Sequence, residues 1–181
     1  YIELLNTSGR QIDISEWVLS GGISFVFPRG TIVPEDGMVV VTRDRDAFLE
    51  QYPVVTELAT VLGDYQGSLD NGGEELRLMD AGPGYPATID YVEYKDGGSW
   101  PEVRSGHSIE LSEVEPNLDN DRGEHWRASS QRNGSPGSNG RQFIRGDFNS
   151  DSRINLSDAV GILLYLFLGE EGPDCLDSGD A

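Results

Sequence analysis

The 181-residue chain has a single cysteine, Cys175, and only 13 lysines and arginines against 32 aspartates and glutamates. One thiol cannot form a disulfide within its own chain, so the cysteine count indicates nothing about the redox compartment. The formal net charge of −19 repels phosphate backbones and disfavours nucleic-acid binding, whereas it attracts divalent cations. The longest apolar run, residues 159–168, is too short to cross a bilayer, so no membrane insertion is expected.

Groups that catalyse reactions are also scarce. The two histidines, His107 and His125, each lie within a short run typical of a β-strand. Neither has carboxylates or thiols at the spacing that a zinc site or a catalytic triad requires. The chain is therefore predicted not to be an enzyme. Its three tryptophans could form a carbohydrate-stacking platform, but their strand positions favour packing in a core.

Residues 1 to about 130 alternate short apolar runs with turn signals, and glycine and proline together account for 32 residues of the chain. Spacings of about ten residues between the runs are typical of an all-β sandwich. One helix is predicted over residues 47–52, because Asp44 or Asp46 can cap it and Pro53 ends it. Strands are expected at residues 1–5, 12–19, 23–27, 38–42, 58–62, 75–79, 88–94, 107–111 and 125–127.

A composition change marks a second module. Residues 129–140 are mostly serine, glycine and asparagine, which is typical of a linker. The predicted domains are therefore residues 1–139 and residues 140–181. The second should contain a helix from about Leu156 to Leu168. Because apolar residues surround most of that helix, we expect the sandwich or a second copy of the chain to cover it.

The most specific pattern in the chain is the segment of residues 147–158. Oxygen-bearing side chains stand at positions 1, 3, 5, 9 and 12 of this segment, and position 7 offers a backbone carbonyl. Ca²⁺ takes six to eight oxygen ligands, and this is the spacing of an EF-hand-type loop. The sequence therefore predicts one Ca²⁺ site. Its ligands are Asp147, Asn149, Asp151, Arg153 (through its carbonyl), Asn155 and Asp158.

Two positions depart from the usual loop. Ser152 stands at position 6, where glycine normally makes the sharp turn, at a cost of about 1 kcal/mol. Asp158 replaces the glutamate at position 12. A polar turn that caps the helix, with Asn155 as N-cap and Asp158 three residues later, is the simpler interpretation, and it is compatible with calcium binding. Loops of moderate calcium affinity fill mainly outside cells, which favours an extracytoplasmic location.

The first module resembles the lamin tail domain family, over roughly residues 1–139. The resemblance implies an immunoglobulin-like β-sandwich. In bacterial proteins this family is a non-catalytic module of secreted and surface chains, often beside hydrolases or calcium repeats. The matching segments are residues 1–6, 12–20, 25–32, 69–74, 100–101, 106–111, 126–129 and 134–137.

The second module resembles the first half of a type I dockerin, in which two calcium loop–helix repeats are paired. Residues 146–160 match one repeat except at Ser152, and residues 175–181 resemble the start of the second, with Asp180 in the place of its first ligand. A complete dockerin implies binding to a cohesin module or a similar partner. Half of one leaves the partner open, either a cohesin-like protein or a second copy of the chain.

Taken as a whole, the sequence predicts a mainly β protein, an immunoglobulin-like sandwich followed by a small calcium-binding loop–helix module. The expected role is non-catalytic docking or presentation at the cell surface or outside the cell. Two alternatives stay open: an accessory domain of a larger secreted hydrolase, and a carbohydrate-binding sandwich, which would expose two tryptophans on one face. Because the chain starts at Tyr1 without a signal sequence, we expect a processed protein or a piece of a longer one.

Overall fold

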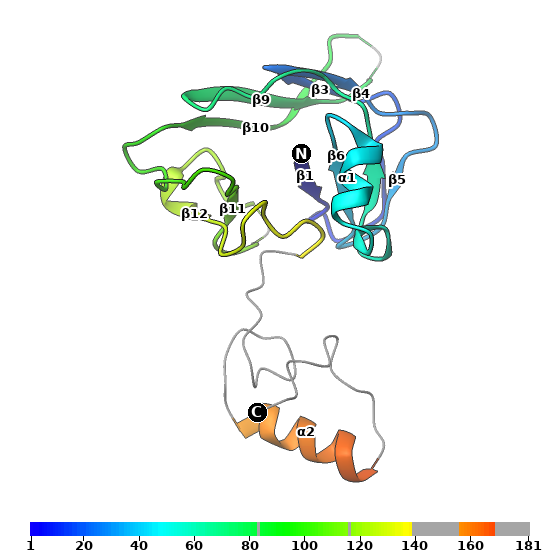
Figure 1. The fold of residues 1–181 in the computed structure, drawn as a ribbon. Helices are drawn as coiled ribbons and strands as arrows, with labels where there is room; N and C mark the ends of the chain where they lie inside the picture. Colours follow the sequence, from blue (N-terminus) through cyan, green and yellow to red (C-terminus); the bar gives the residue numbers. More distant parts are fainter. Residues whose placement is uncertain (83, 116, 139–155, 169–181) are drawn as a thin grey trace. The chain divides into compact units, whose positions relative to one another are not determined.

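The computed structural model describes residues 1–82, 84–115, 117–138 and 156–168 (Figure 1). The chain divides into two compact units, Tyr1–Gly140 and Arg141–Ala181. The first unit is mainly β, and the second contributes the helix α2. In chain order the elements are β1 (Ile2–Leu5), β2 (Ile12–Asp13), β3 (Val18–Gly21), β4 (Ile23–Val26), β5 (Ile32–Val33), β6 (Met38–Val41), α1 (Arg45–Gln51), the 3₁₀ turn η1 (Val55–Glu57), β7 (Thr60–Leu62), β8 (Gln66–Gly67), β9 (Gly73–Met79), β10 (Thr88–Lys95), β11 (Ile109–Leu111), the 3₁₀ turn η2 (Gly123–His125), β12 (Trp126–Ala128) and α2 (Leu156–Leu168).

Two main sheets lie face to face in the first unit. The larger has the strand order β10-β9-β3-β4-β8, and the smaller has the order β1-β6-β7. The strand pairs among the described residues are antiparallel except for β6 with β7. Apolar side chains from both sheets meet in one core. This core includes Leu19, Ile23, Phe25, Phe27, Val39 and Val41.

The alternation of side chains along β4 confirms the strand predicted there. Ile23 and Phe25 are buried, whereas Ser24 and Val26 face solvent. Successive side chains of a strand point to opposite faces, so this pattern places one face of β4 on the core. Phe27, which follows the strand, is fully buried and meets Phe25 edge to face, with 5.1 Å between ring centroids.

The continuous apolar run of β6 is buried on both faces. Val39 and Val41 enter the core between the sheets. Val40 points the other way, into a second cluster with Phe48 of α1 and Val61 of β7. All three valines are 0% exposed, which explains why this strand shows no polar position.

Helix α1 begins at Arg45 because Asp44 caps it. The Asp44 carboxylate accepts a hydrogen bond from the Ala47 backbone N–H at 3.0 Å. The helix ends at Gln51, two residues before Pro53, whose ring is incompatible with the helical conformation of the residue before it. The helix predicted from sequence over residues 47–52 is therefore confirmed, with its start two residues earlier.

Several predicted strands differ from those in the structure. The strand predicted over residues 107–111 begins only at Ile109, so His107 lies before it, and His125 lies in η2 instead of a strand. The run expected over residues 12–19 is split into β2 and β3, because Glu16 turns the backbone with a φ of 61°. The run expected over residues 58–62 begins only at Thr60, because η1 occupies residues 55–57. The short strands β5 and β8 were not predicted, since two residues are too few to show a period.

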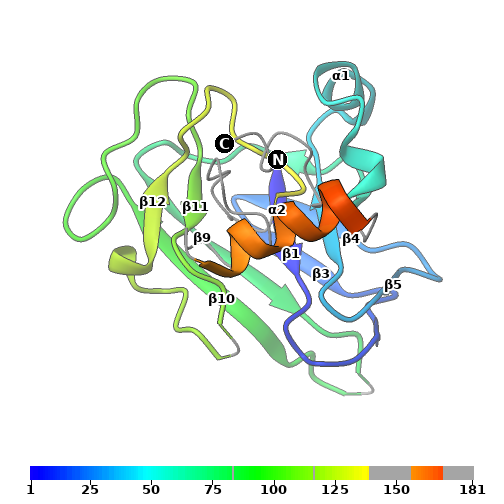
Figure 2. The same ribbon diagram turned by 90° about the horizontal axis from the view of Figure 1, so that it is seen from below.

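A small antiparallel ribbon closes the described part of the first unit. In it β11 pairs with β12, so that Ile109 lies opposite Ala128 and Leu111 lies opposite Trp126. Figures 1 and 2 show this ribbon on the opposite side of β1 from α1. The segment after β12 crosses from the ribbon towards α1 (Figure 1).

Phe27 provides a direct test of the sandwich core. We expect Phe27→Ala to lower the free energy of unfolding by about 3–5 kcal/mol, because it removes a ring that is 0% exposed and leaves a cavity. Val26→Ala is the control, since Val26 directly precedes Phe27 and is 57% exposed, and should change stability by about 0.5 kcal/mol or less. Urea unfolding of both variants measures the difference. Equal losses would contradict the assignment of Phe27 to the core and of Val26 to the solvent-facing side.

Candidate functional site

Asp158 is the one predicted calcium ligand that lies among the described residues. It stands in the first turn of α2 and its side chain is 1% exposed. The other five predicted ligands lie outside the described residues: Asp147, Asn149, Asp151, Arg153 and Asn155. Within the described ranges, no three histidines, cysteines, aspartates or glutamates gather to hold a metal ion. The geometry of the loop therefore stays a prediction.

The chemistry of Asp158 fits a hard cation. A carboxylate is costly to bury unless positive charge or hydrogen bonds compensate it. The start of a helix supplies part of that compensation through its dipole, and a Ca²⁺ ion held by the preceding loop would supply more. The helix-capping interpretation also expects a buried Asp158 side chain, so this burial does not distinguish helix capping from calcium binding.

Helix α2 presents a large apolar surface. Apart from Asp158 it has no charged residue, and seven of its apolar side chains are exposed. Its 13 residues are too few for a bilayer, and no helix in the described part of the chain is long and apolar enough to cross one. The exposed side chains are Leu156, Val160, Leu163, Tyr165, Leu166, Phe167 and Leu168.

Both histidines are anchored to the backbone. The Nδ1 atom of His107 lies 2.9 Å from the carbonyl oxygen of Ser129, and that of His125 lies 2.7 Å from the carbonyl oxygen of Asp119. Because a carbonyl oxygen can only accept a hydrogen bond, the Nδ1 atom of each histidine is the donor.

The tryptophans do not form an exposed platform. Trp100 is 8% exposed and lies 5.8 Å from Trp126, measured between ring centroids. Trp126 is half-buried and its Nε1 donates to the carbonyl oxygen of Asn120 at 2.7 Å. Trp17 packs against the core between the sheets. The pair of exposed tryptophans that a carbohydrate-binding sandwich was expected to show is therefore not present.

The acidic loop at residues 119–121 uses its polar groups within the protein. Asp121 accepts a hydrogen bond from the Glu93 backbone N–H at 2.7 Å, and the Asn120 amide donates to the Asp90 carboxylate at 3.0 Å. Since these bonds cover the free edge of β10, the loop prevents another strand from adding there.

An open groove of about 540 Å³ lies between the start of α1 and the segment after β10. Its aromatic part is a cluster of three rings, in which Phe48 lies 5.2 Å from Tyr1 and 4.8 Å from Tyr52. Burial raises the pKa of both phenols, so each hydroxyl keeps its proton at neutral pH. The lining residues are Tyr1, Thr42, Arg43, Asp44, Ala47, Phe48, Gln51, Tyr52, Gly106, His107, Ser108 and Asn133.

Sequence reasoning missed this groove, because its lining comes from four segments far apart in the chain. The Tyr52 hydroxyl connects two of them by donating to the Asn133 carbonyl at 2.6 Å. Asn133 has a φ of 71°, a conformation that asparagine tolerates better than most residues. The Asn133-Gly134 turn signal was the one local sign that the chain reverses here.

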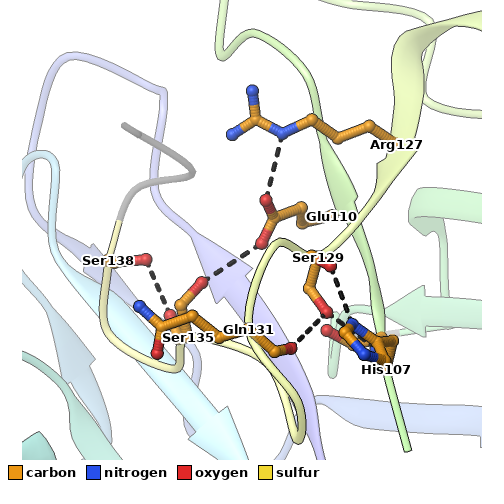
Figure 3. A network of polar contacts seen from close by, with 8 residues as sticks. His107, Glu110, Arg127, Ser129, Gln131, Ser135 and Ser138 are labelled. Carbon is orange, nitrogen blue, oxygen red and sulfur yellow. Dashed lines mark hydrogen bonds and ion pairs between the residues drawn. The ribbon is translucent and has the colours of Figure 1, made fainter. Parts of the chain in front are cut away.

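A network of polar contacts holds the segment of residues 129–138, which follows β12 (Figure 3). The buried Ser129 hydroxyl donates to the Gln131 carbonyl at 2.9 Å, and its carbonyl accepts from His107. Glu110 accepts from Arg127 at 3.0 Å and from the Ser135 hydroxyl at 3.1 Å. The ion pair of Arg127 with Glu110 is the most buried of those in the described residues. Loss of Arg127 would therefore leave the Glu110 carboxylate poorly solvated.

The same segment is connected to β1 through Glu3. The Gly137 backbone N–H donates to the Glu3 carboxylate at 2.6 Å. Partial burial raises the pKa of Glu3, the nearby charge of Glu110 raises it further, and the Gly137 bond opposes both. The net pKa lies above the usual value, so the folded state favours the protonated carboxyl.

The stacked sheets define an immunoglobulin-like β-sandwich. Within that class, the sequence model of the Lamin Tail Domain matches residues 1–96, and the chain belongs to that family. No curated protein matches the chain, and no solved structure does. The match covers β1 to β10 and ends before β11, whereas the resemblance was expected to continue to about residue 139. The ribbon β11–β12 and the network in Figure 3 therefore extend the first unit beyond the matched region.

Glu3→Gln tests the electrostatics at β1. The amide oxygen still accepts from Gly137, while the charge that burial and Glu110 disfavour is removed. Because a raised carboxyl pKa means that ionisation destabilises the fold, we expect the variant to be more stable at pH 7, by about 0.5 kcal/mol for a partly exposed group. This gain in stability should vanish as the pH falls below the pKa of a glutamate carboxyl in the unfolded state, about 4.3.

Thermal melting across this pH range measures the effect. Glu35→Gln, on an exposed turn, is the control for the general benefit of removing one negative charge. A lower melting temperature for Glu3→Gln than for the parent at pH 7 would contradict the raised pKa.

Proposed function

We propose that the protein is a non-catalytic interaction module of a secreted or cell-surface protein, in which calcium orders the segment that follows the Lamin Tail Domain sandwich. The observation that supports this most is the ligand spacing of residues 147–158, and the burial of Asp158 at its last position is compatible with it. A side chain that is 1% exposed fits a metal ligand, and the five oxygen donors predicted upstream complete the set that Ca²⁺ prefers.

The proposed module resembles one half of a dockerin. Asp147, Asn149, Asp151 and Asn155 would supply side-chain oxygens, Arg153 its carbonyl, and Asp158 the last carboxylate. The empty loop would bring its carboxylates close together, so their repulsion should couple the folding of this segment to calcium. The resident ion would neutralise them, and the segment would then position α2.

Calcium binding can be measured by calorimetry on the 181-residue chain. We expect saturable binding of about one ion per chain, lost in an Asp147→Ala, Asp151→Ala double variant, because the loop pattern predicts a single set of ligands. The matched control is Glu50→Ala, Glu57→Ala, which removes the same charge from exposed positions of the sandwich unit. Chelation should also increase proteolysis after residue 143 while the sandwich remains intact.

Equal heats for the loop variant and the control would assign the binding to general negative charge. Absence of saturable binding would show that Ser152 disables the loop, and the sandwich alone would then carry the function.

The exposed apolar surface of α2 is where the protein partner would bind in this proposal. Seven exposed apolar side chains on one short helix are more than an isolated helix keeps in water without a cover. The proposed partner is a cohesin-like protein or a second copy of the chain. The charge of −19 opposes self-association at low salt, so a second copy should bind more tightly as salt screens that charge.

Sedimentation in calcium and moderate salt distinguishes these partners. If a second copy covers α2, we expect a dimer that Leu163→Asp abolishes, because that side chain is 53% exposed and apolar. Val26→Asp, 57% exposed on the sandwich, is the matched control and should leave the dimer intact. A monomer at all concentrations would exclude the second copy and leave the cohesin-like partner, or the sandwich of the same chain, as the cover of α2.

A further inference from the structure

The two main sheets have four outer edges, and three of them are protected against the addition of a further strand. The edge of β10 is covered by the loop at residues 119–121, where Asp121 accepts from the Glu93 backbone N–H. The edge of β7 is capped by Arg45, whose Nε donates to the Val61 carbonyl at 3.2 Å. The strand β8 has two residues, too few to act as a template. Such protection is usual, because an unpaired edge can pair with another chain.

The fourth edge, that of β1, lacks this protection in the described part of the chain. Asn6 directly follows β1, and its backbone N–H donates to the Gly37 carbonyl at 3.0 Å, on the β6 side. Backbone groups of successive residues point to opposite edges of a strand, so those of Leu4 also point to β6, whereas those of Glu3 and Leu5 point away from it. The outward N–H and C=O groups of Glu3 and Leu5 have no hydrogen-bond partner among the described residues.

The strand β11 presents a second open edge. The Ser129 N–H donates to the Ser108 carbonyl at 2.8 Å, so the backbone groups of Ser108 point to β12. By the same alternation, those of Ile109 and Leu111 point away from β12. They too have no hydrogen-bond partner within the ranges that the structure describes.

The two open edges lie next to each other. The Tyr1 hydroxyl forms a hydrogen bond with the Ser108 side chain, and two residues further along both strands the charges of Glu3 and Glu110 interact. The strands β1 and β11 therefore run in the same direction. Figures 1 and 2 show β11 nearer to β1 than β12 is. Both open edges thus face the interval between β1 and β11, and a strand placed there can hydrogen-bond to both.

The side chains of β1 define the chemistry of such a strand. Ile2 and Leu4 pack against the core, so Glu3 points to the other face of the sheet. No described lysine or arginine pairs with Glu3, and the Tyr1 amino group acts on it more weakly than the charge of Glu110 does. Because an added strand also alternates, apolar side chains on its core face and cations on its other face match β1.

The charge of the first unit favours the same kind of partner. Residues 1–138 contain 24 aspartates and glutamates against 10 lysines and arginines, a net charge of −14. This charge attracts a cationic peptide and opposes a second copy of the chain or a nucleic acid. We propose that the interval between β1 and β11 binds an extended segment of a partner protein in which apolar and basic residues alternate, by the addition of a strand to the two open edges.

All of these groups belong to the first unit, so this binding does not require the predicted calcium loop. The test is NMR hydrogen exchange of the 181-residue chain in chelator at low salt, with a seven-residue peptide of alternating lysine and valine as the probe. We expect the amides of Glu3, Leu5, Ile109 and Leu111 to exchange rapidly in the unbound protein. At a peptide concentration ten times the Kd, their exchange should be about tenfold slower. The Leu4 amide faces β6 and is the internal control.

Two further peptides separate the backbone contribution from the charge. A peptide of alternating glutamate and valine keeps the pattern and reverses the sign, so it should bind at least tenfold more weakly. A lysine–valine peptide with N-methylated valines keeps the charge and loses the amide donors of one edge, so it should not protect the four amides.

Variants of β1 assign the edge. Leu5→Pro should weaken binding of the lysine–valine peptide about tenfold relative to Leu5→Ala, because proline lacks the N–H donor and its ring occupies the edge. Glu3→Gln should weaken it about twofold to threefold, as for an exposed ion pair, whereas Glu35→Gln should not. Melting temperatures report whether each variant folds, and the exchange data on the parent protein decide the question if Leu5→Pro does not.

Four results would overturn the proposal. Slow exchange of the four amides in the unbound protein would show that β1 and β11 already have partners. Unchanged exchange at millimolar lysine–valine peptide would show that no strand adds there. Equal protection by the N-methylated peptide would exclude backbone pairing, and equal binding of the glutamate–valine peptide would exclude a preference for basic segments.

Discussion

Burial of β6 on both faces is the interaction on which the first unit depends. A strand sends alternate side chains to opposite sides, so Val39 and Val41 fill the core between the sheets while Val40 packs against Phe48 of α1. The same four-residue strand thus joins the sandwich to its helix. Since Tyr52 follows that helix directly, the position of one groove wall is a consequence of how Val40 is packed.

The opposite wall is held by polar contacts instead. The ribbon β11–β12 has only three residues in each strand and buries little apolar surface. Hydrogen bonds that Ser129 and Glu110 accept compensate for this (Figure 3). Further hydrogen bonds connect the segment to β1, where Gly137 donates to Glu3, and to Tyr52 after α1, which donates to Asn133. An apolar core therefore positions one side of the groove, and a hydrogen-bonded segment outside the matched family region positions the other.

Much of the fold could be predicted because its signals are local. The alternation in β4 and the cap of α1 are each visible within a few residues, and the structure confirms both. The split between β2 and β3 could not be predicted, since it depends on a positive φ at Glu16, a residue type that usually avoids that conformation. The predicted calcium ligands lie within twelve consecutive residues, which is why a sequence pattern can indicate them, and of these Asp158 is the one that the structure describes.

By itself, the sequence determined the sandwich class, the resemblance to the Lamin Tail Domain, the acidic surface and the spacing of the predicted calcium ligands. These properties follow from composition and from residues close together in the chain. Only the tertiary structure decided that Tyr1, Arg43, Tyr52 and Asn133 line one groove, in which a hydrogen bond joins Tyr52 to Asn133. The reason is physical: the groove depends on distances between segments that lie far apart in the chain, as in the Tyr52–Asn133 bond at a separation of 81 residues and the Gly137–Glu3 bond at a separation of 134, and no local pattern encodes those distances.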